Sequence, residues 1–193
     1  FPTRRSSDLL TAAHIDSVGL PCPGAEIVVM GPDGREVPRG EIGELWIRSA
    51  SVIKGYWNNP KATAESFTAG FWHSGDLGSV DADNFVRVFD RQKDMINRGG
   101  LKIYSAEVES VLAGHPAVVE SAIIAKPCPV LGERVHAVIV TRAEVNAESL
   151  RAWCAERLSD YKVPETVALT AEPLPRNANG KVIKRQLREG LSV

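Results

Sequence analysis

Residues 88–114 read VFDRQKDMINRGGLKIYSAEVESVLAG, and the character of the chain changes inside this stretch. An apolar run ends at Phe89, and the charged run DRQKD follows it directly. Ser105 is then expected to cap a helix that continues to about Ala113. The stretch therefore predicts a joint at residues 90–93 between two structural units.

Upstream of the joint, residues 17–89 show short apolar runs separated by turn residues, which is typical of β-strands. Downstream, residues 94–193 alternate between helical and strand patterns. We predict an α+β fold, with a β-rich unit followed by a compact α+β domain. The expected elements are strands at 26–30, 77–80, 85–89, 118–125, 134–141 and 166–169, and helices at 61–67, 105–113 and 147–158. Residues 1–16 stay unassigned, because residues 1–9 (FPTRRSSDL) resemble a translated sequencing adapter.

The composition is that of an ordinary globular protein, with 44% hydrophobic residues, 24% charged residues and a formal net charge of -1. This balance gives no global attraction to nucleic acid or to an anionic membrane, so we expect a small-molecule partner. The sequence contains no run of about 20 apolar residues, so we predict no integral membrane segment. Three scattered cysteines without a Cys-x-x-Cys pair favour reduced thiols and a cytoplasmic location.

Two charged residues near the end of the β-rich unit are candidates for binding a nucleotide. Asp76 follows Gly75 at the start of an apolar run, where a carboxylate can accept hydrogen bonds from the two hydroxyls of a ribose. Arg91 carries a permanent charge on a planar fork that suits ribose or phosphate oxygens. Taken singly, a turn aspartate is the commoner explanation of Asp76, and a solvated charge run is the commoner explanation of Arg91.

Glycines and a lysine in the second unit form two further motifs. The paired Gly99 and Gly100 permit either a turn with positive φ or the close approach of a ligand to bare backbone. Lys181 ends the run LPRNANGK, in which Asn179-Gly180 favours a tight turn that would hold the ammonium at a loop tip.

Several residues suggest functions that the neighbouring sequence does not support. The five basic residues between positions 176 and 188 suggest a nucleic-acid or membrane patch, but a solvated basic tail is the commoner explanation. The four histidines lack metal-ligand spacing, and we predict no metal ligand in this chain. His136 lies in an apolar run and is expected in the core or at a sheet edge, whereas Ser74 lacks the context of a hydrolase nucleophile.

Several segments, taken in order, resemble the adenylate-forming superfamily of acyl-CoA synthetases, peptide-synthetase adenylation domains and beetle luciferases. The resemblance covers roughly residues 17–187, and its motifs are GELWI (43–47), KGYWNNP (54–60), WHSGD (72–76), DRQKD (90–94), RGGLKIYSAEVE (98–109) and PRNANGK (175–181). Peptide-synthetase domains usually read RIELGE where this chain has KIYSAE. CoA is therefore the acceptor that the resemblance favours.

The resemblance implies a ligase that forms an acyl adenylate from a carboxylic acid and ATP, then transfers the acyl group to CoA. It implies that Asp76, Arg91 and Val88 contact the AMP moiety. Lys181 would be the catalytic lysine, bridging the acyl carboxylate and the α-phosphate. Lys93 falls at the hinge position of the family. The implied pantetheine-binding residues are Gly99, Gly100 and Leu101.

Two motifs of the superfamily are not found here: the Ser/Thr/Gly-rich phosphate loop and the aromatic-Gly-x-Thr-Glu segment whose glutamate helps to hold Mg²⁺. We therefore expect a C-terminal fragment that is inactive alone, with the Mg²⁺ ligand in an upstream part. Two alternatives stay open. One is an adenylation domain that loads a carrier protein, and the other is a non-catalytic binding module that retains the fold.

Overall fold

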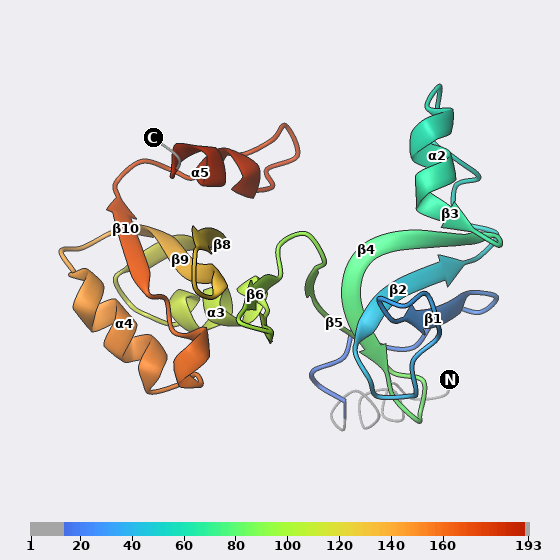
Figure 1. Cartoon of the computed structure of the whole chain (residues 1–193), viewed down its shortest axis with the longest axis horizontal. Coiled ribbons are helices and arrows are strands. Elements are labelled where there is room, and N and C mark those ends of the chain that lie inside the picture. The colour runs from blue at the N-terminus through green and yellow to red at the C-terminus, as the bar shows by residue number, and fades with distance from the viewer. Residues whose placement is uncertain (1–13, 192–193) are drawn as a thin grey trace, which may run out of the picture. The chain divides into compact units, whose positions relative to one another are not determined.

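The computed structural model describes residues 14–191 and divides the chain into two units after Gln92, each built on its own five-stranded sheet (Figure 1). The division falls inside the predicted joint at 90–93. Residues 90 and 91 nevertheless belong to the last strand of the first unit, and residues 92–94 form a turn. The predicted adapter at 1–9 lies outside the described residues.

The sheet of the first unit is antiparallel and has the order β1-β2-β4-β3, with β5 also paired to β4. The long strand β4 therefore pairs with β2 along one edge, and with β3 and β5 along different parts of the other. The elements are β1 (Glu26–Met30), β2 (Gly43–Arg48), α2 (Pro60–Ser66), β3 (Phe67–Thr68), β4 (Phe71–Val80) and β5 (Val86–Arg91). The helix predicted at 61–67 is confirmed within one residue.

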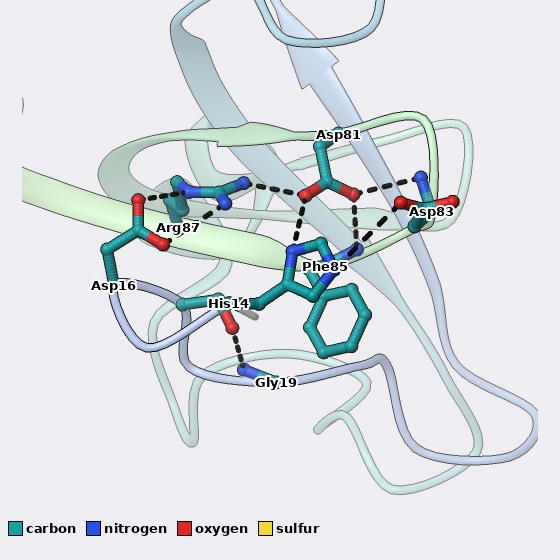
Figure 2. Close-up of polar contacts among 8 residues, drawn as sticks. His14, Asp16, Gly19, Asp81, Asp83, Phe85 and Arg87 are labelled. Atoms are coloured by element: carbon teal, nitrogen blue, oxygen red, sulfur yellow. Dashed lines mark hydrogen bonds and ion pairs between the residues drawn. The ribbon is translucent and has the colours of Figure 1, made fainter. Parts of the chain in front are cut away.

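The turn between β4 and β5, which joins the strands predicted at 77–80 and 85–89, is organised by Asp81. Its Oδ1 accepts hydrogen bonds from the amides of Asp83 and Phe85, the pattern of an aspartate-stabilised turn. Figure 2 shows Arg87 lying between Asp16 and Asp81, with its Nε 2.6 Å from Asp16 and its NH1 2.7 Å from Asp81. These hydrogen bonds lower the pKa of both carboxyl groups.

His14 completes this cluster by stacking on the ring of Phe85, with centroids 3.7 Å apart. Its Nδ1 lies 3.3 Å from Asp81. His14 and Asp16, which the sequence left unassigned, thus contact the β4–β5 hairpin within the first unit.

The sheet of the second unit is mixed: β8 and β9 are antiparallel, and β10 is parallel to β9. The β6–β7 hairpin is part of this sheet because β6 pairs with β9. Its strands are β6 (Ile96–Arg98), β7 (Leu101–Ile103), β8 (Val118–Cys128), β9 (Gly132–Thr141) and β10 (Thr166–Thr170). Its helices are α3 (Ser105–Ala113), α4 (Ala147–Ala155), the 3₁₀ turn η1 (Asp160–Lys162) and α5 (Lys184–Gly190).

Apolar clusters cover both faces of the β8–β9 ladder. On one face α3 and α4 pack on the strands, and this core consists of Ile96, Ile103, Val108, Leu112, Val118, Ile123, Val135, Ala137, Ile139, Leu150 and Cys154. On the other face Ala122 and Val140 contact Leu174, and Val182 and Leu187 pack against this smaller cluster. The C-terminal segment is therefore part of the folded unit, not a solvated tail.

Three local predictions for this unit were wrong. Ser105 does not cap α3, because Tyr104 is the N-cap and Ser105 is the first helical residue, fully buried. The helix expected at 147–158 ends at Ala155. The sequence pattern also missed α5, since only its packing on β8 and its ion pairs distinguish it from a polar tail.

We expect Ile123→Ala to destabilise the second unit by about 2–5 kcal/mol, because this fully buried side chain leaves a cavity in a close-packed core. Val119→Ala, on the same strand but 53% exposed, should change stability by less than about 0.5 kcal/mol. Amide hydrogen exchange of the β8–β9 strands, measured at increasing urea concentration, gives the stability of both variants. Equal losses of stability in the two variants would show that Ile123 is not buried while Val119 is exposed.

Candidate active site

Asp76 and Arg91 lie opposite each other on β4 and β5, where they form a cross-strand pair. The Nε of Arg91 is 2.8 Å from Oδ1 of Asp76, and its NH1 donates to the carbonyl of Ser74 at 3.2 Å. The other carboxylate oxygen of Asp76 makes no hydrogen bond within residues 14–191. The structure thus brings together the two residues predicted to hold a ribose, with one acceptor oxygen available.

Glu44 of β2 supports this pair from the neighbouring strand, a role that the sequence pattern did not reveal. Its Oε1 accepts from the amide of Gly75 at 3.0 Å, and its Oε2 accepts from the indole of Trp46 at 2.9 Å. Gly75 has φ of 71°, a conformation that favours glycine. Glu44 therefore fixes the backbone bend immediately before Asp76.

Val88, the third predicted AMP contact, lies on β5 opposite Gly78 and is 45% exposed. It is thus an apolar surface residue on the strand that carries Arg91. An exposed aliphatic side chain can pack against the flat face of a base, although a single such residue is common on protein surfaces.

Gly99 and Gly100 form the two-residue tip of the β6–β7 hairpin, with φ of 59° and 91°. Positive φ at both central residues is the requirement of the tight hairpin turns, so the conformation explains the glycine pair. The amide of Gly99 donates to the carbonyl of Leu131, and that of Gly100 to Oδ1 of Asn97. Leu101, the next residue, is 46% exposed.

Lys93 is the first residue of the second unit, and its side chain is exposed. The guanidinium of Arg188 on α5 donates to the Lys93 carbonyl at 3.4 Å and to Oδ1 of Asp94 at 2.7 Å. The predicted hinge residue is therefore attached to the second unit through its backbone carbonyl, while its ammonium faces solvent.

Four of the five basic residues between positions 176 and 188 form ion pairs. Arg176 pairs with Glu120, Arg185 with Glu189, and Arg188 with Asp94. Lys184 lies 2.7 Å from Glu109 and 2.6 Å from the hydroxyl of Ser105. These contacts contradict the solvated-tail reading of this segment.

Lys181 is the exception, because its ammonium contacts no hydrogen-bonding or charged partner within residues 14–191, and the side chain is exposed. It follows a turn in which Asn177 is the central residue. The side chain of Asn177 accepts from the amides of Asn179 and Lys181, and its carbonyl accepts from Gly180. The predicted loop tip is thus confirmed.

Residues 14–191 contain no group of three His, Cys, Asp or Glu side chains arranged to hold a metal ion. Within the same residues, no helix has the length and apolar character to cross a bilayer.

Comparison with known proteins gives two family matches. Residues 6–57 match the AMP-binding enzyme model, and residues 107–181 match the model of the AMP-binding enzyme C-terminal domain. A feruloyl-CoA synthase of an Amycolatopsis species is 43% identical over 179 residues, which is 92% of this chain and 36% of that protein. A long-chain-fatty-acid–CoA ligase of Yersinia pestis is 40% identical, covering 90% of this chain and 31% of the ligase.

Among solved structures, the o-succinylbenzoate CoA synthetase of Bacillus subtilis in complex with its acyl-adenylate intermediate aligns with a TM-score of 0.88 at 37% identity. The alignment covers 93% of this chain and 37% of that protein. The same synthetase in complex with ATP and magnesium ion aligns with a TM-score of 0.83 at 39% identity, covering 89% of this chain and 35% of that chain. This chain belongs to the adenylate-forming superfamily.

As a member of this superfamily, the chain spans about a third of the length of the curated relatives that it matches. Its predicted site residues fall on both sides of the division at Gln92. The first unit contributes Asp76, Val88 and Arg91, and the second contributes Lys93, Lys181 and the glycine hairpin.

His136, which the sequence placed in the core or at an edge, is buried on β9. Its Nδ1 lies 2.7 Å from the hydroxyl of Thr166, whereas Nε2 has no hydrogen-bond partner within the described chain. Burial lowers the pKa of this imidazole, and the positive charge of Lys126 lowers it further. Both effects favour the neutral form of His136 in the folded protein.

We expect this burial to make the second unit less stable in mild acid. Because the folded pKa lies below that of an unfolded histidine, about 6.5, the stabilisation is complete above that pH and is lost as the pH falls below it. The slope attributable to His136 is at most about 1.4 kcal/mol per pH unit. Urea midpoints between pH 7.5 and 5 should fall less steeply for His136→Gln than for the wild type, and parallel curves would contradict this assignment.

Proposed function

We propose that this chain is part of an ATP-dependent acyl-CoA ligase acting on a fatty or aryl carboxylic acid. In the first step a carboxylate oxygen attacks the α-phosphorus of ATP, and pyrophosphate leaves. In the second, the CoA thiol attacks the acyl carbonyl, AMP leaves, and the thiol proton is released. The relatives named above, a feruloyl-CoA synthase and a long-chain-fatty-acid–CoA ligase, support both the reaction and the range of acids.

The observation that carries this proposal is the free ammonium of Lys181 at the end of a well-ordered turn. The neighbouring cations are neutralised by carboxylates, so Lys181 alone in this segment offers an uncompensated charge. A cation held at this position can stabilise the negative charge that develops between the acyl carboxylate and the α-phosphate. We therefore assign the catalytic role of the chain to Lys181.

The β4–β5 pair fits the ribose of AMP. Asp76 keeps one carboxylate oxygen for a ribose hydroxyl, and Arg91 is 48% exposed, so its guanidinium can reach a ribose or phosphate oxygen. Val88 would contact the adenine. Lys184 and Arg176, by contrast, are already engaged in ion pairs and are not assigned to the nucleotide.

The second step would use the glycine hairpin. Gly99 and Gly100 present backbone without side chains beside the exposed Leu101, a surface that suits the narrow, partly apolar pantetheine arm of CoA. Mg²⁺, when bound with ATP, would offset phosphate charge, and we place its ligand in a part of the superfamily fold that this chain does not span. Three free cysteines accord with a cytoplasmic enzyme.

A chimeric enzyme tests this proposal, with residues 17–193 of this chain placed behind the upstream part of the Amycolatopsis feruloyl-CoA synthase. It should catalyse acid-dependent ATP–pyrophosphate exchange and form a thioester with CoA. Transfer only to the phosphopantetheine of a carrier protein would favour the carrier-loading alternative. Absence of exchange would favour a binding module.

Lys181→Ala in the chimeric enzyme should slow adenylation roughly 10²-fold or more, because the charge acts in the transition state of that step. Thioester formation from supplied acyl adenylate should be nearly unchanged. Single-turnover measurement of each half-reaction gives both rates. Equal losses in the two steps would contradict the role assigned to Lys181.

Lys93→Pro distinguishes a moving joint from a surface charge. If the backbone at Lys93 must change φ and ψ between two domain arrangements, proline will hold φ near about -65° and favour one of them. If the adenylating arrangement tolerates this φ, Lys93→Pro should retain adenylation and strongly slow thioester formation.

Lys93→Ala is the matched control, because it removes the exposed ammonium and leaves the backbone free. It should affect thioester formation much less than proline does. If Lys93 has no hinge role, the proline and alanine variants will have the same rates in both half-reactions.

A further inference from the structure

Glu120 on β8 anchors the segment that leads to Lys181. Its Oε1 accepts from the amide of Leu174 at 2.9 Å, and its Oε2 forms an ion pair with NH2 of Arg176. The side chain of Glu120 is only 18% exposed. Both oxygens of one partly buried carboxylate therefore hold the start of the PRNANGK motif.

Arg176 extends this anchor to the residue before Lys181. Its NH1 donates to the carbonyl of Gly180 at 2.6 Å, while its NH2 is bound to Glu120. The guanidinium thus links the sheet to the far side of the loop through two different nitrogens, which its rigid planar geometry allows. A displacement of Arg176 would move Gly180 and, with it, the backbone of Lys181.

The loop itself is closed by its own hydrogen bonds. Asn177 and Lys181 exchange backbone and side-chain bonds, Arg176 and Val182 form an isolated β-bridge, and the amide of Ile183 donates to Pro175 at 2.7 Å. These contacts fix the shape of the loop but not its orientation on the sheet. Its orientation depends on the packing of Leu174 and Val182 against the sheet and on the ion pair between Arg176 and Glu120.

A β-bulge in β8 aims Glu120 at this loop. Val118 and Ile123 both belong to the core beneath α3 and α4, yet they are five residues apart, an odd spacing that regular alternation cannot place on one face. The register shift between Val118 and Glu120 resolves the conflict. Glu120 then lies opposite Val140, whose side chain packs with Leu174 on the other face. Bulges commonly re-aim a side chain in this way.

We propose that Glu120, acting through Arg176, is a positioning residue for Lys181 in the adenylation step. The proposal rests on the catalytic role assigned to Lys181 above. Stabilisation of a developing charge falls sharply when the cation is displaced by about 1 Å, so orienting the loop should affect rate rather than only stability.

The test compares Glu120→Gln, Arg176→Gln and the double variant in the chimeric enzyme. Each single change should slow adenylation about tenfold, and the double change little more, because both remove the same contact. Arg176→Lys, which keeps the charge but has one nitrogen in place of the fork, should restore only part of the rate. Thioester formation from supplied acyl adenylate should stay within about twofold of the wild type.

Combining Glu120→Gln with Lys181→Ala distinguishes a positioning role of Glu120 from a merely structural one. A positioning residue has nothing left to position in that background, so the double variant should adenylate at the rate of Lys181→Ala alone. Further slowing by Glu120→Gln in that background would overturn the proposal. Failure of Lys181→Ala itself to slow adenylation would instead overturn the proposed function.

Amide hydrogen exchange of the 193-residue chain supplies a readout that needs no activity. Glu120→Gln should speed exchange at Leu174, whose amide donates to Glu120, while the β8–β9 amides stay protected, which would also show that the variant folds. Glu172→Gln, which removes a nearby exposed carboxylate, is the matched control and should change neither exchange nor rate. Unchanged exchange in Glu120→Gln would contradict the anchoring role.

Discussion

The pairing of β8 with β9 is the constraint on which the second unit depends. Ten cross-strand pairs run from Val118 to Cys128, and the single bulge near Glu120 decides which side chains face α3 and α4. One face builds the main core, and the other receives the C-terminal segment through Ala122 and Val140. A slip of one residue would exchange these faces, placing Glu120 in the core and removing the anchor of the Lys181 loop.

Much of this fold could be predicted from local sequence, and the failures have physical causes. Strand Glu26–Met30 follows from an apolar run bounded by turn residues, and α3 follows from helical spacing. The role of Ser105 could not be predicted in the same way, because its hydroxyl is bound by Lys184, 79 residues away. Helix α5 carries a weak apolar pattern, and ion pairs with distant carboxylates attach it to the fold.

The candidate site likewise contains some residues that local sequence predicts and others that it does not. Motifs such as Asn177–Lys181 are local, so turn chemistry alone predicted the exposed lysine. The pairing of Asp76 with Arg91 depends on the register of β4 and β5, which contains a bulge, and only the resemblance to the superfamily linked the two residues. Glu44 and Glu120 went unnoticed because each supports a group 31 or 54 to 56 residues away.

The arrangement of charge in the C-terminal segment connects stability to chemistry. Three cations that flank Lys181 in sequence, Arg176, Lys184 and Arg188, are each held by a carboxylate of the second unit. Single exposed ion pairs contribute little, but together they fix a short segment at several points and restrict its motion. Neutralising the neighbours also removes the like-charge repulsion that would deter a cationic loop from settling on the sheet. The ammonium of Lys181 is therefore left without a partner among the described residues at a defined place, which is the condition for stabilising an anion that exists only in a transition state.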